Sequence, residues 1–353
     1  MRILQVSPKY FPFIGGVEEH VRNISQRLAK EHQVTVFATD DSGELPREEE
    51  VNGVSIKRFR CFAPHNAYHL SFAMWNELKK SEFDIVHGHS YHTVPLYFSR
   101  YAKRTRYVVT PHYERYGGTR FRNFLLKLYK PFGKRIFEEA DSIITVSEYE
   151  KALLLQDFDI IEDKISLIPN GVNLEEFSRL PDVVKKGKTV LYAGRLEEYK
   201  GVQYLVEALP FLEKDFSLEI IGWGTYKTRL VELAGKLGVK DRVSFYQSLP
   251  RREFIKMLAE AGVFVLLSRY ECFSIVVAEA LAAKTPCIVA NTSALREWVD
   301  GRNCFGIDYP IDAMRLAELI AEVGGQKVSG VKLWDWDNVV RELNTIYGAA
   351  FER

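Results

Sequence analysis

The sequence predicts an α/β protein that consists of two doubly wound parallel sheets. Short runs of apolar and β-branched residues alternate along the chain with segments of helical periodicity, which is typical of parallel strands buried on both faces. The chain has 353 residues, a length that suits two domains of ordinary size. Its composition, 46% hydrophobic and 27% charged, is that of a globular protein with sizeable cores.

Six strands are expected in the first half of the chain, each followed by a helical pattern. They are residues 3–7, 34–39, 84–90, 107–112, 142–147 and 165–172. We interpret residues 1–174 as the first domain, and the acidic run Glu48–Glu50 within it as a solvated loop.

Five further strands are expected in the second half, which we interpret as a domain of residues 189–333. They are residues 189–195, 218–224, 242–248, 263–268 and 286–291. The polar stretch 175–188 between the two domains is interpreted as a linker. The final segment, 334–353, has a helical pattern and is expected to pack back across the first domain.

Charge and cysteine content narrow the classes of function. The net charge is +1, so nucleic acid is not an expected partner. The four cysteines form no C-x-x-C pair, which favours reduced thiols in a cytoplasmic protein. The apolar run at the N-terminus is too short for a signal peptide, and no stretch is long enough for a transmembrane helix. We expect a cytoplasmic protein, and contact with the inner face of the membrane is left open.

Gly15 and Gly16 lie where the loop after the first strand enters a helix. Two glycines allow backbone N–H groups to approach a phosphate at a helix N-terminus. The alternative is a plain tight turn. No G-x-G-x-x-G pattern occurs in the chain, which argues against a nicotinamide or flavin dinucleotide, so no cofactor is expected.

Arg195 and Lys200 flank the turn after the first strand of the second domain. An arginine can bind a phosphate with two hydrogen bonds, and a lysine can add a point charge. The alternative is a pair of exposed surface cations that contribute little. A position at the carboxyl end of a strand favours phosphate binding, because ligands of doubly wound sheets bind there.

The stretch YECFSIVVAEALA carries Glu271 in a strand-end loop and Glu279 two turns into the following helix. The backbone N–H groups of Cys272, Phe273 and Ser274 would be free donors at the start of that helix. A carboxylate at Glu279 can accept two vicinal hydroxyls, such as those of a ribose. The alternative is that Glu279 pairs with a buried cation and that Glu271 faces water.

The nine residues ECFSIVVAE resemble the E-x-F-G-x-x-x-x-E motif of retaining glycosyltransferases of family 4, the GT-B group that includes glycogen synthases and mannosyltransferases. The resemblance covers the whole chain in order. Its other motifs are GGVE (15–18), DIVHGHS (84–90), TPH (110–112), TVSE (145–148), IPNGVN (168–173) and GRLEEYKG (194–201). It implies two Rossmann-like domains that face each other across a cleft, with the C-terminal helix crossing back to the first domain.

The resemblance implies transfer of a hexose from a UDP- or GDP-linked sugar to a hydroxyl acceptor with retained configuration and without a metal. In the family, Glu271 and His112 would be the catalytic residues, and Glu279 would bind the ribose. The remaining roles are diphosphate binding by Arg195, Lys200, Gly15 and Gly16, donor-sugar contacts by Cys272, Phe273 and Ser274, and base contacts by Gly222, Gln247 and Ser248. Ser274 replaces the usual glycine and Cys272 a small residue, so the identity of the donor sugar is in doubt.

Three alternatives stand beside this interpretation. His87, His89 and His112 lie on neighbouring expected strands and could bind zinc, but strand histidines are more often packed or hydrogen-bonded, so no metal site is expected. A nucleotide-sugar epimerase would use a similar fold without an acceptor. A non-catalytic nucleotide-sugar-binding protein would tolerate the loss of Glu271.

The segment from Arg100 to Arg135 is strongly basic, with eleven cations and the single acid Glu114. Apolar residues repeat among the cations at helical spacing: Phe121, Phe124, Leu125, Leu128 and Phe132. A basic amphipathic helix indicates contact with an anionic membrane surface or a lipid-linked acceptor. The alternative is a helix whose apolar face packs on the core and whose cationic face is solvated.

Overall fold

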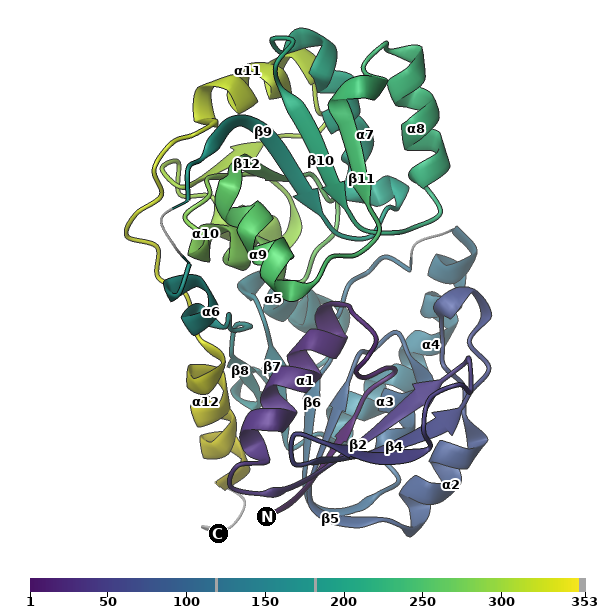
Figure 1. Ribbon diagram of the computed structural model, residues 1–353. Helices are drawn as coiled ribbons and strands as arrows, with labels where there is room; N and C mark the ends of the chain where they lie inside the picture. Colours follow the sequence, from purple (N-terminus) through teal and green to yellow (C-terminus); the bar gives the residue numbers. More distant parts are fainter. Residues whose placement is uncertain (118–119, 181–182, 349–353) are drawn as a thin grey trace. The chain divides into compact units, whose positions relative to one another are not determined.

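The computed structural model describes residues 1–117, 120–180 and 183–348 of the chain (Figure 1). The chain divides into two compact units: Met1–Gly171 together with Trp334–Arg353, and Val172–Leu333. Each unit contains one sheet with parallel strands, so the prediction of two α/β domains is confirmed.

Unit 1 contains an eight-stranded sheet in the order β3-β4-β2-β1-β5-β6-β7-β8. Its strands are β1 (Arg2–Val6), β2 (Gln33–Asp40), β3 (Glu48–Val51), β4 (Val54–Arg60), β5 (Glu82–His89), β6 (Lys103–Thr110), β7 (Ser142–Thr145) and β8 (Ile165–Leu167). Its helices are α1 (Gly16–Leu28), α2 (Phe72–Lys80), α3 (Val94–Ser99), α4 (Arg120–Glu139), α5 (Glu148–Asp157) and α12 (Trp336–Gly348), with short 3₁₀ turns η1 (Pro64–Asn66) and η2 (Glu162–Lys164). All strand pairs are parallel except β3–β4.

The expectation of a loop at Glu48–Glu50 is wrong, because these residues form β3, an edge strand antiparallel to β4. Asn52 and Gly53 both have positive φ and close a two-residue turn between Val51 and Val54. An Asn-Gly pair is a favoured hairpin turn for this reason. Two of the acidic side chains pair with cations of β4: Glu48 lies 3.2 Å from the ammonium of Lys57, and Glu49 pairs with the guanidinium of Arg58.

Unit 2 contains a six-stranded sheet in the order β11-β10-β9-β12-β13-β14, and every pair is parallel. Its strands are β9 (Lys186–Ala193), β10 (Ser217–Ile221), β11 (Val243–Tyr246), β12 (Ala261–Leu266), β13 (Cys287–Ala290) and β14 (Cys304–Ile307). Its helices are α6 (Leu174–Ser178), α7 (Val202–Ala208), α8 (Lys227–Lys236), α9 (Arg251–Glu260), α10 (Ile275–Ala282) and α11 (Ala313–Val323), with 3₁₀ turns η3 (Glu198–Lys200), η4 (Leu209–Phe211), η5 (Lys240–Arg242) and η6 (Ser293–Trp298). The stretch 175–188, interpreted as a linker, contains most of α6 and the start of β9.

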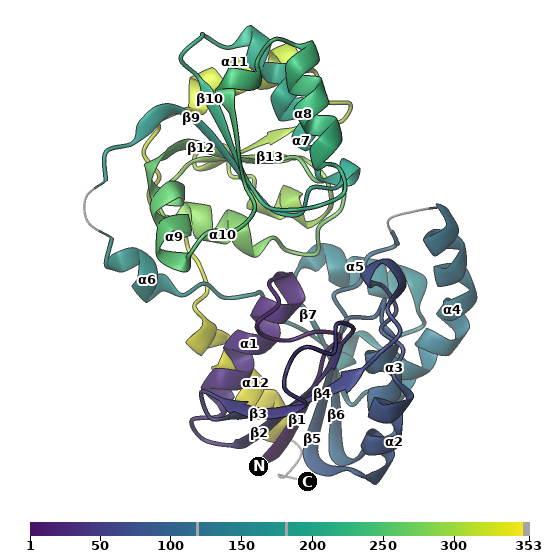
Figure 2. The same ribbon diagram turned by 45° about the vertical axis from the view of Figure 1, so that its right-hand side comes forward.

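The C-terminal helix α12 belongs to unit 1, where it packs beside α1 (Figures 1 and 2). Trp336 is fully buried, and its ring centroid lies 5.7 Å from that of His20 on α1. Gly171, the last residue of the first segment, touches the start of this helix. A Cβ atom there would lie 2.6 Å from the backbone nitrogen of Trp336, so only glycine permits the approach.

Candidate functional site

The strand ends β9 and β10 approach each other closely in unit 2. The Gly194 N–H donates to the Ile221 carbonyl at 2.9 Å, and the Gly222 N–H donates to the Tyr246 carbonyl at 2.8 Å. Gly222 has φ +146, and a Cβ atom there would lie 1.9 Å from the Gly194 carbonyl oxygen. Glycine is therefore required at position 222, because only glycine allows the two backbones to approach so closely. The two hydrogen bonds hold the residues after β9, β10 and β11 together at one edge of the sheet.

Arg195 and Lys200 lie at this edge, after β9. The Arg195 side chain is exposed and donates to the Tyr199 hydroxyl at 2.8 Å. The Lys200 side chain is largely buried, and its Nζ lies 2.6 Å from Oε1 of Glu271. The two cations thus differ: one projects from the surface, and the other is held inside by a carboxylate.

Glu271 and Lys200 form a partly buried ion pair between the loop after β12 and the turn after β9. Burial is the largest influence on the pKa of Lys200 and lowers it, but the charge and hydrogen bond of Glu271 together with Tyr199 outweigh burial, so the net pKa is raised. Lys200 therefore keeps its positive charge at neutral pH. The alternative that Glu271 faces water is wrong, because its side chain is mostly enclosed.

The loop that follows Glu271 enters α10 through Ser274. Ser274 has φ +77, in the left-handed region that favours glycine, and its hydroxyl is buried without a hydrogen-bond partner among the described residues. The Phe273 carbonyl accepts a hydrogen bond from the Trp298 indole at 2.7 Å. Cys272 is partly exposed. The loop is therefore held by its neighbours in a conformation that is costly for serine.

Glu279 lies on α10 and is 8% exposed. Its carboxylate lies 2.6 Å from the Arg251 guanidinium, which also bonds to Glu176 at 2.6 Å. This is the ion pair that the alternative interpretation of Glu279 expected. Ribose binding by Glu279 would have to share the carboxylate with Arg251. Gln247 and Ser248, the expected base contacts, are exposed residues directly after β11.

Unit 1 carries Gly15, Gly16 and His112. Gly15 precedes the first residue of α1 in an extended conformation, and a Cβ there would lie 2.3 Å from the Glu18 carboxylate. At Gly16 a Cβ would meet nothing within 4 Å. The first turn of α1 therefore presents backbone N–H groups without a side-chain cap.

His112 follows β6 with φ +46, and its ring lies in a cluster of imidazoles. Its centroid is 5.0 Å from that of His20 and 6.1 Å from that of His89. His87 does not join this cluster as a free ligand, because its ring nitrogens bond to the Tyr347 hydroxyl at 2.7 Å and the Thr110 hydroxyl at 2.8 Å. Sequence reasoning missed His20; the available signal was its place on the buried face of the first helix.

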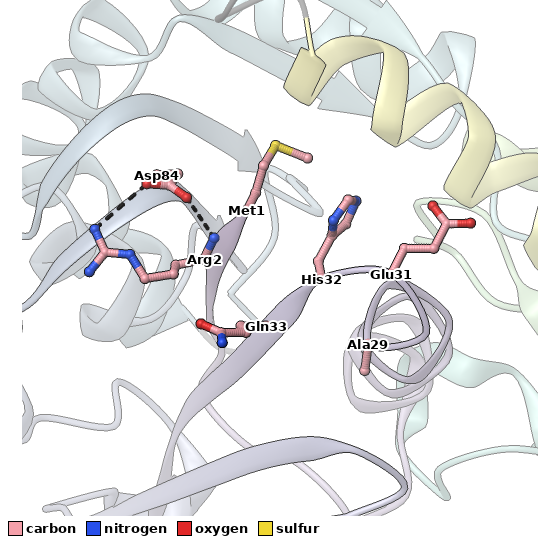
Figure 3. Close-up of a pocket in the computed structure, with 7 residues that line it drawn as sticks. All are labelled: Met1, Arg2, Ala29, Glu31, His32, Gln33 and Asp84. Carbon is pink, nitrogen blue, oxygen red and sulfur yellow. Dashed lines mark hydrogen bonds and ion pairs between the residues drawn. The ribbon is translucent and has the colours of Figure 1, made fainter.

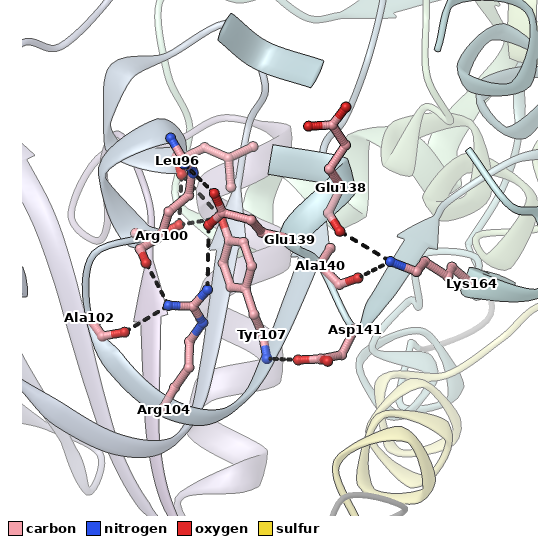
Figure 4. Close-up of polar contacts among 11 residues, drawn as sticks. Leu96, Arg100, Ala102, Arg104, Tyr107, Glu138, Glu139, Ala140, Asp141 and Lys164 are labelled. Carbon is pink, nitrogen blue, oxygen red and sulfur yellow. Dashed lines mark hydrogen bonds and ion pairs between the residues drawn. The ribbon is translucent and has the colours of Figure 1, made fainter. Parts of the chain in front are cut away.

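The basic segment is less cationic in the folded protein than in the sequence, because acids from elsewhere in unit 1 pair with it. Arg100 and Arg104 both turn toward Glu139 at the end of α4 (Figure 4). Asp157 lies 2.6 Å from Arg115 and 3.0 Å from Lys130.

A shallow hollow lies elsewhere in unit 1, where β1 and β2 begin (Figure 3). Its lining residues are Met1, Arg2, Ala29, Glu31, His32, Gln33 and Asp84. Ligands of doubly wound sheets bind at the carboxyl ends of the strands, so we do not assign the candidate site to this hollow. Within the described part of the chain, none of the helices is both long and apolar enough to cross a membrane.

Comparison with known proteins agrees with this two-part organisation. The profile described as Glycosyltransferase Family 4 matches residues 14–176, and the profile described as Glycosyl transferases group 1 matches residues 175–325. An uncharacterised glycosyltransferase of Methanocaldococcus jannaschii is 30% identical over 100% of this chain and 99% of its own length. A glycogen synthase of Mycobacterium tuberculosis is 27% identical over 99% of this chain and 95% of its own length.

Two solved structures show the same fold. The sucrose-phosphate synthase of Thermosynechococcus elongatus has a TM-score of 0.77 at 21% identity, with 99% of each chain covered. The HepE protein of Anabaena, solved with UDP and glucose, has a TM-score of 0.78 at 17% identity, with 99% of this chain and all of that one covered. The two α/β units have the GT-B fold, and the chain belongs to glycosyltransferase family 4, within the group 1 glycosyl transferases.

Proposed function

We propose that the protein is a retaining transferase that moves a hexose from a UDP- or GDP-linked sugar to a hydroxyl acceptor. The observation that carries the proposal is the Lys200–Glu271 pair, 2.6 Å apart beside Arg195 at the carboxyl edge of the unit 2 sheet. A buried cation next to a carboxylate is an arrangement that can hold a diphosphate and a sugar hydroxyl side by side.

In this proposal Arg195 and Lys200 stabilise the negative charge that develops on the departing nucleoside diphosphate. The N–H groups of the first turn of α1, at Gly15 and Gly16, would add to this stabilisation. Glu271 and the backbone of Cys272, Phe273 and Ser274 would hold the sugar hydroxyls. The departing phosphate would help to deprotonate the acceptor on the same face of the sugar.

The remaining roles complete the donor site. Glu279 would accept the ribose hydroxyls, and Gly222, Gln247 and Ser248 would contact the base. His112 would lie near the sugar and support the transition state. Both donor classes occur among the relatives. HepE is solved with UDP-glucose. A 24% identical protein of Xanthomonas oryzae is named GDP-mannose:cellobiosyl-diphosphopolyprenol alpha-mannosyltransferase.

The first experiment is binding and slow hydrolysis across UDP-, GDP- and ADP-linked sugars, with EDTA present. Tight binding of one nucleoside diphosphate and release of sugar from its matching donor would support the proposal and name the donor. The same panel run with Glu271→Gln tests the competing functions. A non-catalytic binding protein would release no sugar and would bind the nucleotide sugar equally well with and without that change. An epimerase would convert the donor sugar without any acceptor.

We further propose that the acceptor is reached at an anionic membrane surface, such as the cytoplasmic leaflet, through α4. Phe124, Leu128 and Phe132 are 57%, 55% and 56% exposed and follow one another at four-residue spacing along this helix. Phe124, Leu128 and Phe132 thus point to solvent, while Ile136 and Phe137 of the same helix pack in the core, so α4 has an exposed apolar stripe as well as a packed side.

Cations accompany this apolar stripe. Lys127 and Arg135 are exposed on the same side of α4 and form no ion pair with any described residue. Long cationic side chains beside an exposed apolar stripe suit anionic headgroups above and acyl chains below. A lipid-linked acceptor is the class that such a surface favours.

A further inference from the structure

Three histidines of unit 1 meet at the carboxyl ends of β5 and β6. One ring nitrogen from each of His20, His89 and His112 lies within 4.8 Å of the other two. The rings come from α1, from the last residue of β5 and from the residue two positions after β6. His20 and His89 are fully enclosed, and His112 is partly exposed.

Each of these rings has one buried nitrogen that lacks a hydrogen-bond partner among the described residues. The three atoms are Nε2 of His20, Nδ1 of His89 and Nε2 of His112. A buried polar atom without a partner costs about 1–3 kcal/mol. Since the three ring centroids lie only 5.0–6.1 Å apart, these atoms indicate a missing common partner rather than three separate defects.

Hydrogen bonds on the opposite ring nitrogens fix the tautomers of two of these rings. Nδ1 of His20 lies 2.7 Å from the amide oxygen of Asn170, and Nε2 of His89 lies 2.7 Å from the amide oxygen of Gln5. An amide oxygen only accepts, so each of these nitrogens carries the hydrogen. The other nitrogen of each ring therefore presents a lone pair to the cluster. Burial lowers the pKa of His20 to about 4 and holds those of His89 and His112 well below the ordinary value, so all three rings are neutral at pH 7.

We propose that His20, His89 and His112 bind a divalent first-row transition ion, with Zn²⁺ as the best fit. Three neutral imidazoles without a carboxylate exclude Mg²⁺ and Ca²⁺, which prefer oxygen ligands. A tetrahedral zinc with Zn–N bonds of about 2.0–2.1 Å places its nitrogens about 3.3 Å apart and leaves a fourth position open. The ring nitrogens, which lie within 4.8 Å of one another, must come closer by up to about 1.5 Å to reach that spacing.

The surrounding shell has the form that zinc sites use. Ligand histidines usually donate their second ring N–H to a carbonyl or carboxylate oxygen, as His20 does to Asn170 and His89 does to Gln5. Gln5 is itself held, because its amide nitrogen donates to the Tyr347 hydroxyl at 3.3 Å. This site differs from the trio expected from the sequence, since His87 has both nitrogens engaged and His20 takes its place.

The inference goes beyond sugar transfer and does not depend on it. An occupied site would join α1, β5 and the loop after β6 through one ion. The ion would also fix the ring of His112. Zinc is therefore expected to change the affinity of any ligand that contacts this residue.

The test is a zinc titration of the full chain, stripped with a chelator and then measured in competition with a chromophoric chelator. The wild type is expected to bind one ion tightly per chain. His89→Gln and His20→Gln are expected to lose this binding, and the control His32→Gln, which alters a histidine where β2 begins, is expected to keep it. No stoichiometric binding by the wild type, or unchanged binding by both ligand variants, would overturn the proposal.

Two further measurements guard against variants that fail to fold. Asn170→Ala keeps all three ligands and is expected to weaken zinc binding about 10–100-fold, as loss of an outer-shell partner does. Wild-type protein loaded with Co²⁺ should show the visible absorption bands of a tetrahedral site with nitrogen ligands. Absence of those bands at stoichiometric Co²⁺ would overturn the proposal without any variant.

Discussion

The ion pair between Lys200 and Glu271 joins two side chains that the proposed function assigns to different parts of one donor. While the donor is absent, each neutralises the other at 2.6 Å. A diphosphate that approaches Lys200 would compete with the carboxylate for the ammonium. Its binding would thereby release the carboxylate toward a sugar hydroxyl. The ion pair thus keeps Lys200 close to where the diphosphate would bind and Glu271 close to where the sugar hydroxyl would bind.

Lys200→Ala is expected to weaken binding of the nucleoside diphosphate by about 1.5–3 kcal/mol, the usual contribution of a hydrogen bond to a charged group. Isothermal titration measures the change directly. Lys188→Ala is the matched control, because Lys188 is also ion-paired but lies near the opposite end of β9. Equal affinities of wild type and Lys200→Ala would rule out the proposed role.

Glu279→Ala is expected to reduce nucleotide affinity more than thermal stability. Arg251 would retain its second partner, Glu176, so the change does not leave an isolated buried charge. Affinity by titration and Tm by calorimetry are measured on the same preparation. A large fall in Tm with intact affinity would instead show that Glu279 serves only to hold Arg251.

Ser274→Gly is expected to raise stability by about 1 kcal/mol, because the left-handed conformation costs a non-glycine residue about 1–2 kcal/mol and glycine returns part of this through the unfolded chain. The change also removes a buried hydroxyl without a described partner. Urea unfolding is the measurement. Ser217→Gly in β10, which has no positive φ, should be destabilising. A stability loss at Ser274 would show that the backbone there is not strained.

At the scale of single elements, α4 is the one whose orientation matters most for the acceptor. Its buried apolar side chains, Ile136 and Phe137, lie in its last turns, whereas Phe124, Leu128 and Phe132 remain exposed. A helix that serves only as a core element would turn its aromatic residues inward. This exposed stripe is the physical basis for the proposed membrane contact.

Replacing Phe124, Leu128 and Phe132 together by serine is expected to abolish binding to anionic vesicles while leaving Tm nearly unchanged. The wild type should bind such vesicles weakly and lose binding at high salt, because the charge contribution is screened. Co-sedimentation with anionic and neutral vesicles measures both effects. Phe211→Ser, at an exposed phenylalanine of unit 2, is the control. Equal sedimentation with both vesicle types would contradict the proposed contact.

Buried strands were predictable because their residues are apolar without interruption, as in β12 and β13. The edge hairpin β3–β4 was not predicted, because two of the four residues of β3 are exposed and acids outnumber apolar residues in β3. Its Asn52-Gly53 turn was a usable signal. β14 was not predicted, because only two of its four residues are fully buried and one of the others is a glycine. The outward stripe of α4 was not predictable, because periodicity alone does not reveal which side of a helix meets the core.

The candidate site divides in the same way. Arg195, Lys200 and Glu271 could be placed from strand ends and motifs, because a parallel sheet brings its carboxyl ends to one edge. The partners in the Lys200–Glu271 and Glu279–Arg251 pairs could not be named, since each pair joins residues far apart in sequence. The same holds for His20, which reaches His89 and His112 only once α1 packs on the sheet.

At the scale of the whole molecule, the buried imidazoles make unit 1 sensitive to acid. The six described histidines with lowered pKa are His20, His69, His87, His89, His92 and His112. Burial is the largest cause for each, and it brings His20, His69 and His92 to about 4. All six belong to unit 1.

Between pH 6.5 and about 4 the unfolded chain takes up protons at these histidines and the folded unit does not. The free energy of unfolding should therefore fall as pH falls, by about 1.4 kcal/mol per pH unit for each imidazole. Glu150 acts in the opposite sense: burial raises its pKa to about 8, so its contribution is present below pH 4.5 and is lost as pH rises to 8. Because six histidines act in one direction and Glu150 alone in the other, the free energy of unfolding of unit 1 is expected to fall as pH falls.

Hydrogen exchange at pH 7.5 and 5.5, with EDTA present and rates corrected for intrinsic pH dependence, measures this effect. Unit 1 is expected to lose protection at pH 5.5 while unit 2 keeps it. His92→Gln should reduce the pH dependence of unit 1 by about one proton. Equal protection of unit 1 at both pH values would contradict the assignment of buried neutral histidines.

The chain leaves unit 1 after Gly171 and returns to it at Trp334, so the ribosome makes all of unit 2 before it makes α12. Trp336 and Tyr347 of α12 are core residues of unit 1, and the Tyr347 hydroxyl bonds to both Gln5 and His87. During synthesis, unit 2 can complete its core while unit 1 still lacks one wall. The unit that is begun first is thus finished last, and its exposed apolar surface between those moments is where a nascent chain would need protection from aggregation.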